Sequence, residues 1–247
     1  SLADAEQFKK VIDIIRAEPE RRYVVPSAPG KRFSGDEKVT DLLYECYEMA
    51  TLGKPIDEFF EKIASRYRDI VSGLGLDIDL DREFATIKNA MVHKAGRDYA
   101  ASRGEYLNGK VLACALGFDF VDAADVIFFA ENGTLDAERT NSVLHDVLSR
   151  HYNAVIPGFY GAMPNDTIRT FSRGGSDITG SIVARAANAD LYENWTDVSG
   201  FLMADPRIIE NPRVMHTITY TELRELSYMG ASVLQEEAIF PVREVNI

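Results

Sequence analysis

Short apolar runs alternate with helical segments through the second half of the sequence, and this alternation restricts the fold more than any other feature. Val126–Phe129 and Asn153–Ile156 have the length and the β-branched or aromatic content of buried strands. Strands are predicted over 118–121, 126–129, 153–156 and 189–195, helices over 136–150 and 177–188, and a hairpin that turns at 165–166. Because parallel strands need helical crossovers, the pattern predicts an α/β fold with a largely parallel sheet covered by helices.

The first half of the sequence is mainly helical. Apolar side chains recur at three- and four-residue spacing from Ala5 to Ile15, which predicts a helix. Tyr23–Val25 predicts a short buried strand, and the turn that follows is where α/β proteins place ligand loops. Further helices are predicted over 36–53, 55–73, 79–101 and 105–116, with Asp36 as the cap of the first, Gly53 closing it and Pro55 in the first turn of the second.

Composition excludes several classes of function. The chain has 247 residues and a formal net charge of −12. An acidic chain is poorly suited to binding nucleic acid, because that affinity depends on cancelling phosphate charge. We find no signal-peptide pattern and no apolar run long enough to span a bilayer, so we expect a cytoplasmic protein with no membrane partner.

Cysteine and histidine do not indicate a metal site. Cys46 and Cys114 both lie in helical patterns and are predicted to be buried free thiols of a reducing compartment. The four histidines lack the spacing of a metal-ligand motif such as HExxH. No metal ligand is therefore predicted.

The strongest indication of a ligand site in the sequence is the run Arg173-Gly174-Gly175-Ser176-Asp177. Two glycines let the backbone approach a ligand closely and direct N–H groups at an anion, and the arginine supplies a planar fork for a carboxylate or phosphate. A plain glycine turn with an aspartate cap accounts for the same residues. The combination nevertheless matches an anionic substrate.

Other segments carry weaker indications. Thr196 and Asp197 follow a predicted strand, which would put a hydroxyl and a carboxylate at the carboxyl edge of the sheet. The segment Ser102–Glu105 predicts a glycine turn, and Glu105 is predicted to begin the next helix, where the macrodipole favours a carboxylate. An ordinary turn, helix start or solvated helix face also explains each of these. The spacings of a P-loop and of the GxGxxG fingerprint are absent, so any ATP site must be of another type.

Taken in order, these segments resemble the aspartate kinase family, which has the amino-acid-kinase fold. The resemblance runs over nearly the whole chain and rests on Phe171–Asp177, Trp195–Gly200, Asp205–Arg207, Ser102–Glu105 and Lys38–Asp41. It implies a three-layer α/β/α sandwich around one mostly parallel sheet. It also implies that residues 36–116 form an aspartate-side region and residues 160–247 a nucleotide-side region of one catalytic domain.

The resemblance implies a substrate site for aspartate formed by five residues. Arg173 would pair with the α-carboxylate of aspartate and Glu105 with its α-ammonium. Thr40 and Ser176 would hydrogen-bond the substrate. Asp177 would act as the catalytic residue that orients a lysine and organises the phosphate region.

The nucleotide side follows from the same resemblance. Thr196, Asp197, Asp205 and Arg207 would contact ATP, which implies an Mg²⁺–ATP complex. The implied reaction makes 4-phospho-L-aspartate, the first step toward lysine, threonine and methionine. A homodimer is the usual assembly of the family.

Three departures from the family pattern affect these expectations. The family opens with a strand and a Lys-Phe-Gly-Gly-Ser/Thr-Ser loop, and this sequence begins at about the end of that loop, so we expect a fragment that lacks this segment and the ACT regulatory domains. Ser232 and Gln235 stand where many members have lysine and histidine, and Leu202 replaces a frequent tyrosine. Two alternatives remain: another kinase of this fold that acts on N-acetylglutamate or glutamate, and a non-catalytic sensor of an amino acid or nucleotide.

Overall fold

The computed structural model describes residues 2–172, 174–196, 200–203, 208–228, 234, 236–245 and 247. The helices are α1 (Ala5–Ala17), α2 (Val39–Thr51), α3 (Asp57–Leu74), α4 (Asp81–Val92), α5 (Arg97–Leu116), α6 (Ala123–Val126), α7 (Ala137–Leu148), α8 (Gly175–Ala186), α9 (Tyr220–Tyr228) and α10 (Glu236–Arg243). The strands are β1 (Tyr23–Val24), β2 (Asp119–Phe120), β3 (Ala154–Val155), β4 (Tyr160–Ala162) and β5 (Ile168–Thr170).

A parallel sheet lies at the centre of the molecule, with β3 between β1 and β2. Tyr23 and Asp119 both pair with Ala154, and each pairing is parallel. The long helical connections between these strands are what parallel pairing requires. The α/β fold predicted from the alternating pattern is confirmed.

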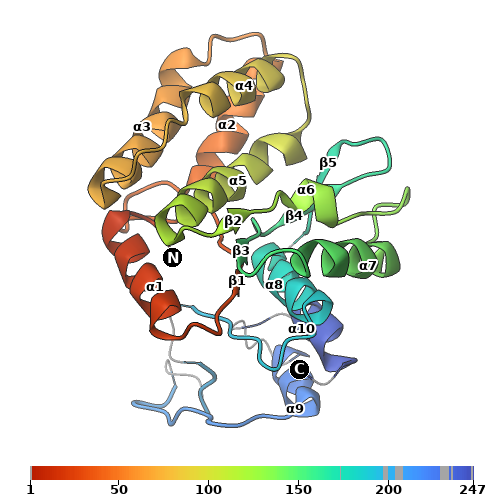
Figure 1. The fold of residues 1–247 in the computed structure, drawn as a ribbon. Coiled ribbons are helices and arrows are strands. Elements are labelled where there is room, and N and C mark those ends of the chain that lie inside the picture. The colour runs from red at the N-terminus through yellow and green to blue at the C-terminus, as the bar shows by residue number, and fades with distance from the viewer. Residues whose placement is uncertain are drawn as a thin grey trace.

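Helices cover the sheet on both faces (Figure 1). Val155 of β3 packs into a core shared with residues of α1 to α5. Its neighbours Ala154 and Ile156 point the other way, into a second core with α7 and α8. Because successive side chains of a strand face opposite sides, one apolar strand supplies both cores. This arrangement is the predicted three-layer α/β/α sandwich.

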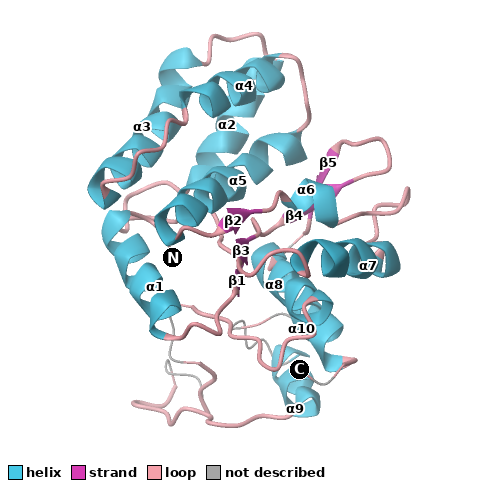
Figure 2. Ribbon diagram, in the orientation of Figure 1, coloured by secondary structure: helices cyan, strands magenta, loops and turns pink. Residues whose placement is uncertain are grey.

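A separate hairpin, β4–β5, leaves the sheet region beside α6 (Figure 2). Tyr160 pairs with Thr170 and Ala162 with Ile168 in an antiparallel register. Asp166 has a positive φ of 62° in the turn, a conformation that Asp and Asn tolerate better than most residues. The predicted hairpin is confirmed, and its second strand leads directly toward Gly174.

The helix boundaries around Gly104 differ from those predicted. The break falls at 93–96, where Lys94 has φ 60° and Gly96 has φ 110°, and α5 then runs unbroken through Gly104. A Cβ on Gly104 would lie 2.8 Å from the Cβ of Ala28. The glycine therefore permits close packing of α5 against the turn after β1, and Glu105 lies in mid-helix and does not begin one.

Two predicted strands are wrong. The apolar run 126–129 begins as the end of α6, because the Asp122 carboxylate caps a helical turn by accepting from the Ala124 N–H. Phe128 and Phe129 then form only isolated bridges. Residues 189–195 form no strand, so Thr196 does not follow one. Around 126 a local helix cap replaces the predicted sheet ladder, and in 189–195 the side chains of Tyr192 and Asn194 bond to Asp177 instead.

Smaller expectations also changed. Asp36 does not cap α2, whose N-cap is Lys38, because the Asp36 carboxylate binds arginines instead. Pro55 precedes α3 and does not lie in its first turn. Cys46 is a buried free thiol as predicted, and burial raises its pKa to about 11, whereas Cys114 is exposed on α5.

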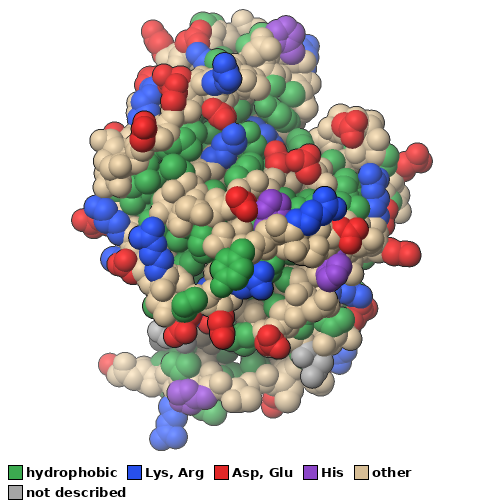
Figure 3. Space-filling model, in the orientation of Figure 1, with side chains coloured by type: hydrophobic (Ala, Val, Ile, Leu, Met, Phe, Trp, Pro, Cys, Tyr) green, Lys and Arg blue, Asp and Glu red, His purple; other side chains and the backbone are tan. Residues whose placement is uncertain are grey.

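Among the described residues, no helix is both long and apolar enough to cross a membrane. Acidic and basic side chains are interspersed over the face drawn in Figure 3, and no broad basic area appears on it. The charge distribution of this face agrees with the acidic composition.

Candidate active site

The carboxyl ends of β1 and β3 meet at one edge of the sheet. The N–H of Ile156 donates to the carbonyl of Val24 at 2.9 Å, and farther along the N–H of Gly158 donates to the carbonyl of Pro26 at 3.1 Å. These bonds hold the turn after β1 beside the segment after β3. Ligands of open α/β sheets bind at this edge.

Helix α5 brings Glu105 to the turn after β1. The side chain is only 6% exposed, and its carboxylate accepts the backbone N–H of Ala28. Burial raises the pKa of Glu105 to about 8, although the Ala28 hydrogen bond and the positive charge of Arg103 act in the opposite direction. The second oxygen, Oε2, is buried and has no hydrogen-bond partner among the described residues. A buried acceptor of this kind favours a ligand that brings a positive charge or N–H donors.

Thr40 lies beside the same turn. It is the second residue of α2 and is half-buried. The preceding N–H, that of Val39, donates to the carbonyl of Pro29 at 3.2 Å, and a Cβ on Gly104 would lie 3.7 Å from Val39 Cγ1. The start of α2 is therefore placed next to Glu105 by direct packing.

The N-terminus of α8 meets the segment after β3. Gly174 is the N-cap, with φ 58°, and Gly175 follows against Phe159. A Cβ on Gly158 would lie 2.6 Å from the Oγ of Ser176, so only glycine at 158 lets that serine approach the edge of the sheet. The first N–H groups of a helix have no intrahelical partner and attract anions.

Asp177 lies in the first turn of α8, and it is not the cap that one interpretation of the sequence expected. Its carboxylate accepts from the side-chain amide of Asn194 at 3.0 Å, and its carbonyl accepts from the hydroxyl of Tyr192 at 3.0 Å. These two bonds bring the segment that contains exposed Thr196 to the start of α8.

Several predicted site residues lie outside the described residues. They are Arg173, Asp197, Asp205, Arg207, Ser232 and Gln235. Leu202 is described and forms an isolated bridge with Val214. The structure thus brings together Thr40, Glu105, Gly174, Gly175, Ser176 and Asp177 around one sheet edge.

Sequence reasoning missed two residues of this region. Asn108, fully buried on α5, donates from its amide to the carbonyl of Ser27 at 2.6 Å. Its position three residues after Glu105 on one helix was the available indication. Gly158 was also missed, although a glycine just after a buried strand indicates close approach of another group.

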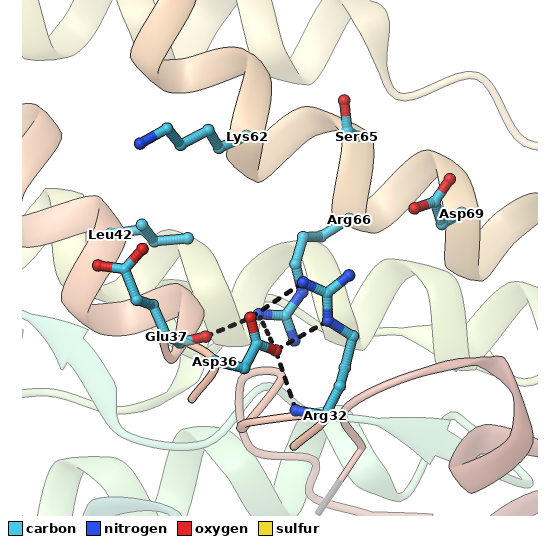
Figure 4. A pocket seen from close by; sticks show the side chains of 8 residues that line it. All are labelled: Arg32, Asp36, Glu37, Leu42, Lys62, Ser65, Arg66 and Asp69. Atoms are coloured by element: carbon cyan, nitrogen blue, oxygen red, sulfur yellow. Dashed lines mark hydrogen bonds and ion pairs between the residues drawn. The ribbon is translucent and has the colours of Figure 1, made fainter. Parts of the chain in front are cut away.

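A cluster of charged side chains anchors the loop between the turn after β1 and α2. Arg66 of α3 is 5% exposed and donates to the carbonyls of Gly30 at 2.7 Å and Glu37 at 2.8 Å. Asp36 accepts from Arg32 at 2.8 Å and lies 3.4 Å from Arg66 (Figure 4). The Arg32 hydrogen bonds hold the pKa of the Asp36 carboxyl well below its ordinary value. A cavity of about 280 Å³ lies among these residues.

Within the described part of the chain, no group of three or more His, Cys, Asp or Glu side chains could hold a metal ion. The edge of the sheet instead offers a buried carboxyl, hydroxyl groups and a glycine-rich helix N-terminus. Together these groups can bind a zwitterion and an anion next to each other.

Comparison with known proteins identifies the relatives of this chain. The family model of the amino acid kinase family matches residues 1–247. The crystal structure of Clostridium acetobutylicum aspartate kinase superposes with a TM-score of 0.95 and 54% identity over 100% of this chain. Aspartokinase 3 of Bacillus subtilis is 35% identical over 100% of this chain. E. coli aspartokinase III, solved with aspartate and ADP, has the same fold with a TM-score of 0.80 at 22% identity over 98% of this chain.

This chain is shorter than its relatives. It covers 57% of each of the two solved structures and 58% of the Bacillus protein.

Proposed function

Because this chain belongs to the amino acid kinase family, we propose that it is the catalytic part of an aspartate kinase. It would transfer the γ-phosphate of ATP to the side-chain carboxylate of L-aspartate and form 4-phospho-L-aspartate. The observation that carries this proposal is the 54% identity to an aspartate kinase over the whole chain. The buried, half-paired carboxyl of Glu105 supports it, because aspartate carries an ammonium group.

Each residue of the predicted substrate side has a chemically suitable role. Glu105 accepts the α-ammonium of aspartate, and Arg173 pairs with its α-carboxylate through two parallel N–H groups. Thr40 and Ser176 hydrogen-bond the substrate from α2 and α8. Asp177, fixed by Asn194, organises the region of the transferring phosphate.

The nucleotide side is proposed to lie next to α8. Gly174 and Gly175 direct N–H groups at phosphate oxygens. Thr196, Asp197, Asp205 and Arg207 line the ATP pocket. Mg²⁺ is proposed as the companion of ATP, since it binds mainly to phosphate oxygens and water with one or two carboxylates and needs no cage of protein ligands.

The chemical step requires positioning more than covalent help. The carboxylate of aspartate is already a nucleophile at neutral pH, so no general base is needed. The obstacle is repulsion between two anions. Backbone N–H groups at α8 and the Arg173 cation offset that repulsion and hold the attacking oxygen in line with the phosphate.

Other properties follow from the same proposal. Residues 36–116, which contain α2 to α5, form the aspartate-side region, and residues 160–247 form the nucleotide-side region. The reaction belongs to the biosynthesis of lysine, threonine and methionine. A cytoplasmic homodimer is the proposed state of the whole protein.

The direct test is ADP formation by the full-length protein with Mg²⁺–ATP and each candidate substrate. We expect turnover with aspartate and little with glutamate or N-acetylglutamate. Preferred turnover of either of these two would replace the proposed substrate. Aspartate binding without any ADP formation would instead identify a sensor.

Substitution of Arg173 tests the substrate side. We expect Arg173→Ala in the full-length protein to raise the aspartate KM by roughly 30-fold or more, because a carboxylate loses a charged partner worth about 2–5 kcal/mol. Arg173→Lys should restore only part of this, since a point charge cannot reproduce the planar fork. Steady-state kinetics with aspartate and with ATP varied separately make the measurement. Unchanged aspartate kinetics in both variants would remove Arg173 from the site.

A further inference from the structure

Two side chains of α5 hold one peptide unit of the turn after β1. Asn108 donates from Nδ2 to the carbonyl of Ser27 at 2.6 Å, and Glu105 accepts the N–H of Ala28. That carbonyl and that N–H belong to the same peptide bond. The two side chains are three residues apart, so they lie on one face of the helix.

Each of these side chains keeps a second buried acceptor without a partner. Glu105 Oε2 and Asn108 Oδ1 are both buried and form no hydrogen bond with the described residues. The orientation of the Asn108 amide is fixed, because a carbonyl only accepts and its partner must be the NH₂ group. Leaving buried acceptors unpaired costs free energy, so the arrangement favours a donor that can enter from outside the chain.

Among the residues that the structure describes, the charged and titratable groups near Glu105 do not provide that donor. Arg103 lies on the same helix, with its guanidinium over the rings of Tyr99 and Tyr106 and bonded to Ser102 Oγ. From α3, the hydroxyl of Tyr67 donates to the carbonyl of Gly104 at 2.7 Å.

Helix α2 contributes Tyr44, whose ring lies against the guanidinium of Arg97. Both Tyr44 and Tyr67 interact with the charge of Glu105. Neither tyrosine hydrogen-bonds to Oε2.

A primary ammonium fits two unpaired acceptors on one helix face better than other groups do. It brings three N–H donors and a positive charge, whereas an amide nitrogen in an N-acylated amino acid brings one donor and no charge. We propose that Asn108 is a second acceptor for the α-ammonium of the substrate, beside Glu105, and that the pair selects amino acids with a free amine. This inference rests on the proposed function and adds a specificity-determining residue to it.

The test compares aspartate with succinate, which is aspartate without its amine. Binding of each to the full-length protein is measured by competition or calorimetry for the wild type and for Asn108→Ala. We expect aspartate affinity to fall about tenfold, because a hydrogen bond to a charged group is lost. Succinate affinity should change less than twofold, because it offers no donor to Oδ1.

Asn141→Ala is the matched control. Asn141 also has a buried Oδ1 without a partner in the described part of the chain, but it lies on α7, away from the turn after β1. Its substitution should leave the affinities for both ligands unchanged. If Asn108→Ala does not fold, the affinities for aspartate and succinate are compared in Asn108→Ser, which keeps a small polar group.

The outcomes separate this inference from the proposed function. Equal loss of aspartate and succinate binding would show that Asn108 acts only by holding the Ser27–Ala28 peptide, and no loss of either would show that Oδ1 needs no ligand donor. Both results overturn the inference and leave the kinase proposal standing. A wild-type protein that neither binds nor phosphorylates aspartate would overturn both.

Discussion

Replacing Glu105 with glutamine is expected to weaken aspartate binding by roughly 100-fold, because a buried charged partner of the ammonium is worth about 3 kcal/mol. Glutamine keeps the shape of the side chain and an oxygen for the N–H of Ala28. It cannot carry a charge at any pH. The loss should therefore appear in the aspartate KM or Kd, while the KM for ATP changes little.

The wild-type protein should also bind aspartate more tightly as the pH rises. Burial raises the pKa of Glu105 to about 8, so most of the free protein carries a neutral carboxyl at pH 6 to 7. Only the ionised form pairs with an ammonium. Affinity should increase by up to about tenfold per pH unit between pH 6 and 8 and then level off. Glu105→Gln should remove this dependence, and succinate should not show it in either protein.

The stability of the ligand-free wild-type protein, unlike its affinity for aspartate, should decrease as the pH rises. The folded-state pKa of Glu105 lies above its unfolded value, so its contribution to stability is complete below about pH 4.5 and is lost as the pH rises toward 8, at about 1.4 kcal/mol per unit. Glutamine never ionises, so thermal unfolding at pH 8 without ligand should occur at a higher temperature in Glu105→Gln than in the wild type. If the difference in melting temperature between Glu105→Gln and the wild type is the same at pH 5 as at pH 8, the buried, neutral carboxyl is contradicted.

The hydrophobic pattern predicted a largely parallel sheet covered by helices because hydrophobic period is a local property, whereas the three layers were implied by the family resemblance. The strands at 23–25 and 153–156 were predictable from short β-branched runs, and α1 and α7 from their spacing, although β1 is only partly buried. The run at 126–129 had the same composition but formed no strand, because the Asp122 cap starts a helix just before it. Apolar runs of this length do not distinguish a strand from a buried helix end.

The site was only partly predictable for a different reason. Residues joined by one motif, such as Gly174 to Asp177, could be recognised together. The contacts that create the site link distant segments: Gly104 with Ala28, Gly158 with Ser176, and Asn108 with Ser27. Gly104 was expected in a turn, since nothing in the local sequence shows that another backbone approaches it. The burial of Glu105 and its effect on the pKa depend on that same packing.

Removing the guanidinium of Arg66 should destabilise the protein by about 3–5 kcal/mol, because Arg66→Ala leaves buried acceptors without their donor and breaks a buried ion pair. Arg66 donates to the carbonyls of Ala3, Gly30 and Glu37. One side chain thus joins the segment before α1, the turn after β1 and the residue that precedes the N-cap of α2. For a chain of this size, that loss corresponds to a melting temperature lower by roughly 6–20 °C.

Arg68→Ala is the matched control for Arg66→Ala on the same helix. Arg68 is about half exposed, and its ion pairs with Glu61 and Asp81 lie in solvent, where such pairs contribute about 1 kcal/mol or less. The Arg68 variant should therefore melt within a few degrees of the wild type, and salt should reduce the difference. The melting temperature of Arg66→Lys should fall between those of the other two variants, since one ammonium cannot replace a fork that reaches three carbonyls.

Because the anchored loop leads directly into Thr40, Arg66→Ala should also raise the aspartate KM more than the ATP KM at a temperature where the variant is folded. An Arg66 variant that melts with the Arg68 variant and keeps wild-type aspartate kinetics would show that the loop is held in place by packing alone.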